Sequence, residues 1–299
     1  MMILRAIRYI IVLPILLLTL AFSPKAGDTP TAPLVGQDTF VLVDALAMGQ
    51  GLTTDGEFYY TSGSIAKLRL TSLAKYTFNG MRFVSQKIGA LPQSLLERGF
   101  RHIGGISAYN GLIYAAVEGK ADGHDIAAVV TFDCATLECT GNVYDLPSAQ
   151  YDDGVPWLAV DRDTGLLYAS KWSHADTVYV YDTANGMAQV RTIPVLNGEL
   201  DRIQGGEFYN GTLYLSHDNH EGDTKQILTF SPADGSIKLY AERNVGDMDR
   251  CEAEGLTVWP SPDGSFLHVL DYNKRIGVFV RHYAPNGGMG EQLINNNEQ

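Results

Sequence analysis

The stretch at Gly206–Tyr214 reads GEFYNGTLY: a glycine, a short strand, a two-residue turn and a second strand. Four other parts of the 299-residue chain repeat this pattern, and each opens on a glycine: Gly51, Gly105, Gly154 and Gly255. Successive opening glycines lie about 50 residues apart, and a fixed period of that length is typical of repeat architectures. Because β-branched and aromatic residues fill the segments between the turns, the repeats predict strands, and strand-only repeats predict a β-propeller.

Each hairpin is followed by two further strand-like segments, for example Gln226–Phe230 and Ile237–Tyr240 in the fourth repeat. The fifth repeat lacks its fourth strand because the chain becomes polar after Tyr283, whereas a spare strand-like segment, Thr39–Asp44, precedes the first repeat. We therefore predict an all-β fold, a single five-bladed β-propeller closed by this N-terminal strand. Closure removes the unpaired strand edges that favour aggregation. Pro92–Arg98 is the one helix-like piece of the mature chain.

The turns and the tyrosines that follow them have a structural explanation. Four Asp-Gly or Asn-Gly dipeptides are expected to form primed hairpin turns, which need positive φ angles. A tyrosine follows in four of the repeats, and we expect it to pack between blades, with a role in function as the alternative. These residues are Asp55-Gly56, Asn110-Gly111, Asn210-Gly211 and Asp263-Gly264, and Tyr59, Tyr114, Tyr168 and Tyr214.

The chain divides into four segments. Residues 1–26 are predicted to be a signal peptide, because Arg5 and Arg8 precede a short apolar run, Tyr9–Phe22. That run is shorter than the roughly 20 residues of a membrane-spanning helix. A linker at 27–38, the propeller at 39–283 and a flexible C-terminal tail at 284–299 follow. We therefore expect a secreted or periplasmic protein with no stable membrane insertion beyond the signal segment; an uncleaved signal anchor is the alternative.

The net charge of −12 narrows the choice of partners. An acidic surface repels phosphate backbones, which disfavours a nucleic-acid partner. A small-molecule or peptide ligand remains compatible with this charge. The sequence does not determine the oligomeric state.

Structural roles are predicted for all three cysteines. Cys134 and Cys139 flank a tight turn, and in an exported protein this spacing favours a local disulfide, with two reduced thiols as the alternative. Cys251 lies beside Glu252 and close to Glu254, whose negative charges disfavour a reactive thiolate. We expect Cys251 to be a buried free thiol.

Propeller geometry groups many polar residues at one mouth of the central channel. The connections between blades and the loops after the second strand of each blade lie on the same face. Histidines there can act as bases near neutral pH, and an oxygen-rich set of carboxylates suits calcium. The alternative is that these residues cap turns around a water-filled mouth. The candidates are His102 and His217 as catalytic residues; Gln50, Gln204, Glu207, Trp172 and Asp271 as ligand-binding residues; and Glu118, Asp153, Asp218 and Glu254 as metal ligands, with calcium the most favoured metal. His217, His220 and Asp218 form an alternative transition-metal set.

Two kinds of short sequence motif resemble motifs of known propeller families. Asp153–Trp157 and Glu254–Val258 resemble the calcium-dependent lactonase and strictosidine-synthase-like propellers, and this resemblance implies that Asp153 and Glu254 are ligands of a channel metal. Gln50–Leu52 and Gln204–Gly206 are similar to the phrase that opens a blade in propeller-type glutaminyl cyclotransferases. Both resemblances cover the repeat phrase rather than the whole chain.

Two functions of different classes follow. The first is an exported propeller that binds a small polar ligand or peptide at an acidic, histidine-containing mouth, since no nucleophile–base pair is evident and polar loops suffice for binding. The alternative is a metal-dependent hydrolase of the lactonase or phosphoesterase type, in which calcium or zinc polarises the substrate and His102 or His217 acts as base.

Overall fold

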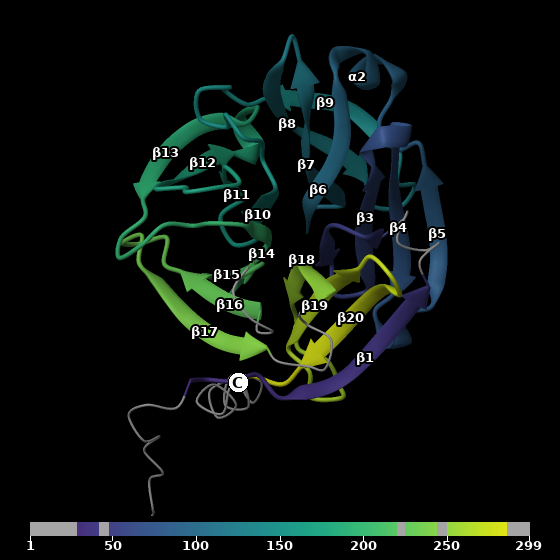
Figure 1. Cartoon of the computed structure of the whole chain (residues 1–299), viewed down its shortest axis with the longest axis vertical. Coiled ribbons are helices and arrows are strands. Elements are labelled where there is room, and N and C mark those ends of the chain that lie inside the picture. Colours follow the sequence, from purple (N-terminus) through teal and green to yellow (C-terminus); the bar gives the residue numbers. More distant parts are fainter. Residues whose placement is uncertain (1–28, 42–47, 220–224, 244–249, 286–299) are drawn as a thin grey trace, which may run out of the picture.

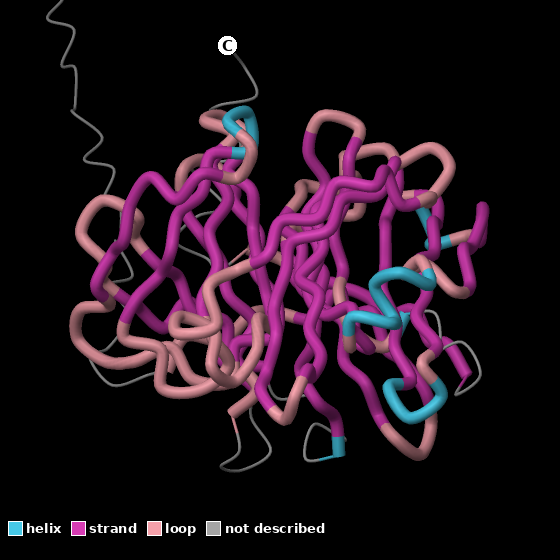
Figure 2. Tube along the Cα trace, turned by 90° about the horizontal axis from the view of Figure 1, so that it is seen from above, coloured by secondary structure: helices cyan, strands magenta, loops and turns pink. Residues whose placement is uncertain are grey.

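The computed structural model describes residues 29–41, 48–219, 225–243 and 250–285, and these form five four-stranded antiparallel sheets arranged in a ring (Figure 1). The predicted five-bladed β-propeller is confirmed. Viewed from the side, loops gather at the two ends of the strands, which form the two faces of the ring (Figure 2).

Blades are numbered along the chain, and each begins with its innermost strand. Blade 1 contains β2 (Leu52–Thr54), β3 (Phe58–Ile65), β4 (Leu70–Thr77) and β5 (Phe83–Ile88); blade 2 contains β6 (Phe100–Tyr109), β7 (Leu112–Ala121), β8 (His124–Asp133) and β9 (Cys139–Asp145); blade 3 contains β10 (Trp157–Asp161), β11 (Leu166–Ser170), β12 (Thr177–Asp182) and β13 (Ala188–Pro194); blade 4 contains β14 (Ile203–Tyr209), β15 (Thr212–His217), β16 (Lys225–Phe230) and β17 (Ile237–Arg243); blade 5 contains β18 (Cys251–Val258), β19 (Leu267–Asn273) and β20 (Gly277–Tyr283).

The outer strand of blade 5 comes from the N-terminal part of the chain. Strand β1 (Leu34–Val41) runs antiparallel to β20, with Thr39 opposite Phe279, and so closes the ring as predicted. It begins at Leu34 rather than at Thr39, because backbone pairing extends through Gly36, Gln37 and Asp38, which interrupt the strand signal in the sequence. The rest of the predicted strand, residues 42–44, lies outside the described residues, as do the predicted signal peptide at 1–26 and most of the predicted tail.

Glycines on the innermost strands allow neighbouring blades to touch around the axis. A Cβ atom on Gly105 would lie 3.0 Å from Trp157 Cα, and one on Gly205 would lie 2.7 Å from Leu256 N. At Gly255 a Cβ would lie 2.6 Å from the carbonyl carbon of Gly51. These glycines are therefore required by the close approach of backbones.

The third repeat departs from the alignment predicted from its glycine. Trp157, not Gly154, occupies the position equivalent to the inner glycines, because Trp157 pairs with Ser170 just as Gly205 pairs with Ser216. The equivalent residue of the fourth repeat is likewise Gly205 rather than Gly206. Gly206 instead makes room for the indole, since a Cβ there would lie 2.9 Å from Trp157 Cε3.

The hairpin turns follow the prediction only in part. Asn110 and Gly111 both have positive φ, at 49° and 75°, as a primed turn requires, and Asn210-Gly211 behaves in the same way. At Asp55-Gly56 only the glycine has a positive φ. There the aspartate side chain caps the turn instead, accepting hydrogen bonds from the next two backbone N–H groups after the glycine. Asp263-Gly264 likewise has a positive φ only at the glycine.

The tyrosines pack between blades as expected. Tyr168 of blade 3 contacts Phe208 of blade 4, with ring centroids 4.7 Å apart, and Tyr214 of blade 4 packs on Phe266 of blade 5. The helix-like piece forms α2 (Gln93–Arg98), which ends at Gly99 in the left-handed conformation. Short 3-10 turns occur at Ala66–Leu68, Asn79–Met81 and Thr183–Asn185. Within the described ranges, no helix has the length and apolar character that crossing a membrane needs.

All three cysteines are free thiols. The structure thus shows the alternative to the predicted disulfide at Cys134 and Cys139. Cys134 packs into the core beside Tyr60. Cys139 lies on the outer strand β9, opposite Phe132 of β8. Cys251 is a buried free thiol, as expected.

Candidate functional site

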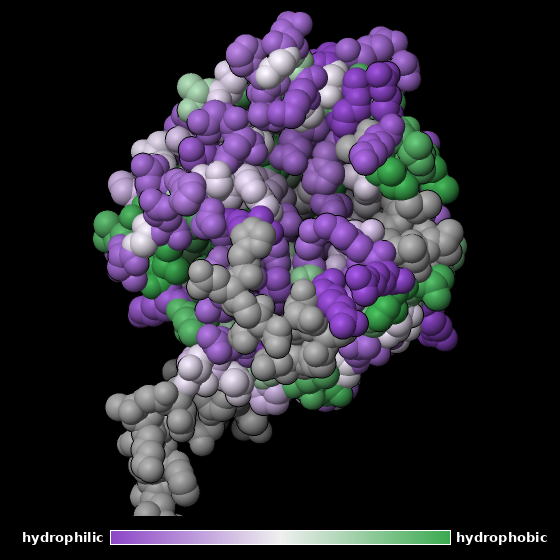
Figure 3. Space-filling view, viewed as in Figure 1, coloured by the Kyte–Doolittle hydropathy of each residue, from purple (hydrophilic) through white to green (hydrophobic). Residues whose placement is uncertain are grey.

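A pocket of about 360 Å³ opens in blade 2, at the ends of β6 and β7 beside the connection from blade 2 to blade 3. Three of the predicted site residues meet there. Hydrophilic residues cover the middle of the face seen in Figure 3, and hydrophobic ones show mainly near its outer edge. The pocket is lined by Gly99, Arg101, His102, Glu118, Gly119, Lys120, Asp125 and Asp153.

His102 is held between a carboxylate and an amide. Its Nδ1 lies 3.1 Å from Glu118 Oε1, and its Nε2 lies 2.6 Å from Gln50 Oε1. Gln50 Nε2 donates to the Gly49 carbonyl at 2.8 Å and faces Glu254 Oε1 at 3.4 Å, which fixes the orientation of the amide. An amide oxygen only accepts, so His102 Nε2 carries a proton. Nε2 is therefore held as a donor, whereas Nδ1 lies near Glu118 but makes no hydrogen bond. This arrangement suits a positioned hydrogen-bond donor better than a free base.

Arg101 gives the pocket a positive charge that no carboxylate neutralises within the described residues. One guanidinium nitrogen donates to the carbonyls of Phe100, at 2.6 Å, and Leu96. The second cation of the pocket, Lys120, lies 2.8 Å from Asp125. Asp153 accepts backbone hydrogen bonds from Trp172 and Ser173, and so caps the loop after β11.

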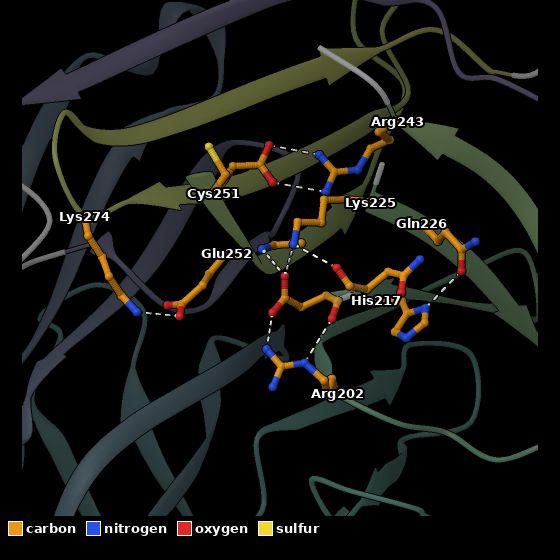
Figure 4. A network of polar contacts seen from close by, with 12 residues as sticks. Arg202, His217, Lys225, Gln226, Arg243, Cys251, Glu252 and Lys274 are labelled. Atoms are coloured by element: carbon orange, nitrogen blue, oxygen red, sulfur yellow. Dashed lines mark hydrogen bonds and ion pairs between the residues drawn. The ribbon is translucent and has the colours of Figure 1, made fainter. Parts of the chain in front are cut away.

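Arg202 and Lys225 belong to a network of polar contacts (Figure 4), and both pair with Asp218, which therefore lies in this network rather than at an open mouth. Its side chain is buried, 2.5 Å from Lys225 Nζ and paired with Arg202, and it also accepts from Ala253 N at 3.2 Å. Burial alone would favour the neutral acid, but the hydrogen bonds from Lys225 and Arg202 outweigh it and hold the pKa of Asp218 below its usual range. The network joins blade 4 to the first strand of blade 5.

Asp271 is enclosed between two arginines. Arg243 donates to both carboxylate oxygens, at 2.9 and 3.0 Å, and Arg281 donates at 2.8 Å. All three side chains are buried. Both carboxylate oxygens of Asp271 are bound by guanidinium groups, so the residue connects β17, β19 and β20. Because its side chain is fully buried, it is not accessible to a ligand.

Glu207 lies inside the channel. Its side chain is fully buried on β14 and accepts hydrogen bonds from Thr53 of β2, at 2.9 Å, and from Thr257 of β18, at 3.1 Å. Burial raises the pKa of Glu207, and Arg162, at 3.5 Å, opposes that rise. The side chain thus links the inner strands of blades 1, 4 and 5.

The other predicted residues lie apart from the pocket. His217 of β15 faces Gln226, with 3.1 Å between Nδ1 and Oε1, and burial lowers the pKa of its imidazole. Trp172 is stacked against the Arg202 guanidinium, 4.9 Å from the ring centroid. Gln204 is half-buried on β14. His220 lies outside the described residues.

The four predicted metal ligands do not converge. Glu118 and Asp153 line the pocket, Asp218 is bound to two cations, and Glu254 is buried behind Gln50. In the described part of the chain no three His, Cys, Asp or Glu side chains are placed to hold a metal ion. Calcium binding stays a prediction.

Glu254 provides a test of that prediction. Burial, followed by the charges of Glu252, Asp218 and Asp271, raises the pKa of Glu254 well above its usual range. The stability due to the neutral acid is therefore complete below the unfolded pKa of about 4.3 and is lost as pH rises, by up to about 1.4 kcal/mol per pH unit, until Glu254 ionises in the folded protein. We expect Glu254→Gln to match the wild type at pH 4 and to exceed its unfolding free energy at pH 7, measured by urea denaturation. A calcium ligand would give the opposite result, a less stable variant at pH 7.

Sequence reasoning missed the basic residues that determine this electrostatic pattern. The prediction selected carboxylates and histidines, whereas the structure pairs each buried carboxylate outside the pocket with a cation or a hydroxyl group, apart from Glu254. A usable signal existed: carboxylates gathered in a closed ring need compensating charges, and Arg101 directly precedes His102. The missed residues are Arg101, Arg202, Lys225, Arg243 and Arg281.

The sequence matches no protein-family model and no curated protein. Solved structures match it in fold. The GH43_1 enzyme from Xanthomonas citri is 14% identical over 86% of this chain and 91% of that chain, with a TM-score of 0.52. The RS223 β-xylosidase is 11% identical over 82% of this chain and 94% of that chain, with a TM-score of 0.56. This chain is thus similar in architecture to glycoside hydrolases, and at such identities the likeness shows the fold alone.

A further match is the Kuenenia stuttgartiensis hydrazine synthase, 14% identical over 79% of this chain, with a TM-score of 0.43. This chain spans only 58% of that chain. The likeness is too weak to bear on function.

Proposed function

We propose that this protein is an exported propeller that binds a small polar ligand in the blade 2 pocket, and that Arg101 binds an acidic group of that ligand. The observation that supports this most strongly is the guanidinium of Arg101, which lines the pocket and has no carboxylate partner among the described residues. A guanidinium presents donors in a fork that matches a carboxylate.

The remaining lining suits hydroxyl groups. Glu118 and Asp153 offer oxygen acceptors, and backbone hydrogen bonds from Val155, Trp172 and Ser173 hold their carboxylates in place. A volume of about 360 Å³ falls in the range of small-molecule sites. The combination favours a ligand of monosaccharide size with one acidic group.

The acidic surface does not prevent this. Charges on exposed groups are screened over about 8 Å at physiological salt. The guanidinium of Arg101 lies in the pocket itself and can contact the acidic group directly, while Glu118 and Asp153 face the hydroxyl groups of the ligand.

The test compares ligands that differ by one carboxylate. D-glucuronate and D-glucose serve as the pair, within a panel of other matched acids and neutral sugars, and binding is measured as the rise in Tm. An acid that binds is expected to raise the Tm of the wild type by several degrees at 100 times its Kd. The neutral counterpart of that acid should raise the Tm less. In Arg101→Gln, the acid and its neutral counterpart should raise the Tm by the same amount.

Arg98→Gln is the matched control. Arg98 lies three residues earlier and pairs with Asp145 outside the pocket, so this variant should keep the wild-type response. An acid-dependent shift that persists in Arg101→Gln, or one that disappears in Arg98→Gln as well, would contradict the assignment.

A hydrolase is the second candidate, because the Glu118 carboxylate lies 3.1 Å from His102 Nδ1, close to the position from which a carboxylate orients a catalytic base. In that case His102 Nε2 must leave Gln50 before it can accept a proton. Turnover of an ester or glycoside by the wild type but not by His102→Gln would favour this candidate over simple binding.

A further inference from the structure

A pair of histidines lies at the seam between blade 5 and blade 1, far from the pocket in sequence and on other blades. His268 of β19 and His282 of β20 face each other across the sheet, with 2.7 Å between their Nδ1 atoms. His268 is 1% exposed and His282 is 9% exposed. A cavity of about 340 Å³ reaches His282, together with Asp38, Tyr59 and Asp263.

The outer nitrogen of each ring is held by a group that can only accept. His268 Nε2 lies 2.8 Å from the Trp259 carbonyl oxygen, and His282 Nε2 lies 3.0 Å from Asp38 Oδ2. A carbonyl and a carboxylate oxygen are acceptors, so each Nε2 carries a proton. If both rings were neutral, two lone pairs would face each other at the hydrogen-bond distance of the Nδ1 atoms.

A proton between the two Nδ1 atoms resolves this conflict. Burial, together with the charge of the neighbouring His282, lowers the pKa of His268 to about 4. The phenol of Tyr59, from β3, also lies 2.9 Å from His268 Nδ1, where it donates to the same lone pair. His268 is thus the neutral acceptor, and the extra proton belongs to His282.

We propose that the folded protein binds a proton at His282, and that the resulting imidazolium holds the closing strand β1 in the ring through Asp38. The charges that face His282 are those of Asp38 from β1 and Asp263 from the turn before β19; the neutral groups are His268 from β19 and Tyr59 from β3. Loss of the proton removes the ion pair to Asp38 and sets the two Nδ1 lone pairs against each other.

The sign of the pH effect follows from linkage. An unfolded histidine loses its proton near pH 6.5, whereas in the folded protein the carboxylate of Asp38 and the lone pair of His268 Nδ1 favour the protonated form of His282. Folding therefore takes up a proton above that pH, and the folding equilibrium constant falls by up to tenfold per pH unit. Ring closure is thus tightest in mildly acidic solution and weakens as the pH rises.

The direct test is nitrogen NMR of the histidine rings in the full chain at pH 7.0, with assignments from His268→Gln and His282→Gln. We expect His282 to show two protonated ring nitrogens and His268 to show a proton on Nε2 alone. A neutral His282 would overturn the proposal. So would a stoichiometric metal ion at the pair, detected by elemental analysis and by changes in both rings on addition of EDTA.

Asp38→Asn gives an independent readout, since Asp38 is about one-third exposed and its amide keeps the hydrogen bond without the charge. Between pH 6 and 8 this variant should lose part of the wild-type fall in the folding equilibrium constant. Glu199→Gln is the matched control, because it removes the carboxylate 2.8 Å from the exposed His174. Identical pH dependence in the wild type and Asp38→Asn would overturn the role assigned to Asp38.

Discussion

Replacing Gly255 by alanine is expected to lower the free energy of unfolding by about 3 kcal/mol or more, at the upper end of overpacking effects. The new Cβ would lie 2.6 Å from the Gly51 carbonyl carbon and 2.8 Å from its Cα. Both are backbone atoms of the residue directly before the neighbouring inner strand β2, so no side chain can rotate away. For a domain of this size the Tm should fall by about 10 °C, measured by calorimetry.

Gly36→Ala is the control for this prediction. Gly36 lies on the closing strand, and the nearest atom to an added Cβ is His282 Cδ2, at 3.9 Å, an ordinary contact. We expect its unfolding free energy to stay within about 1 kcal/mol of the wild type. Equal stabilities for Gly255→Ala and the wild type would contradict the close packing of inner strands around the axis.

Asp271→Asn is expected to destabilise the protein by roughly 3–5 kcal/mol, because it leaves two buried guanidinium groups without their shared counter-charge. Arg243 and Arg281 are both buried, and their ion pairs with Asp271 measure 2.9 and 2.8 Å. Urea denaturation measures the change, and a slope similar to that of the wild type would show that the folded state is otherwise retained.

An exposed ion pair nearby provides the comparison. Lys274 and Glu252 lie 2.7 Å apart with most of the lysine in solvent, so Glu252→Gln should change stability by at most about 1 kcal/mol. If Asp271→Asn were as mild as Glu252→Gln, or if it abolished ligand binding while stability stayed unchanged, Asp271 would be a ligand-binding residue and not a structural one.

The blade count and the closing strand were predictable because the repeat period and the missing last strand are both visible in sequence. The position of Trp157 was not, since it replaces a glycine and its indole depends on space beside Gly206 in the next blade. Alignment on glycine spacing alone therefore misplaced the third repeat.

The site was predictable only in part. Propeller connectivity correctly groups His102, Glu118 and Asp153, which line one pocket. It does not show which carboxylates are neutralised: Asp271 pairs with Arg243 from another blade, 28 positions earlier in the chain. Nor does any motif reveal the contact of His282 with Asp38, which lie at opposite ends of the propeller sequence.

The most direct test of the proposed binding site is a crystal structure of the protein with the acid that gives the largest rise in Tm. We predict that the ligand occupies the blade 2 pocket, with its acidic group within hydrogen-bond distance of the Arg101 guanidinium and a hydroxyl group on Glu118. A ligand bound elsewhere on the ring, or bound in the pocket with its acidic group turned away from Arg101, would contradict the account.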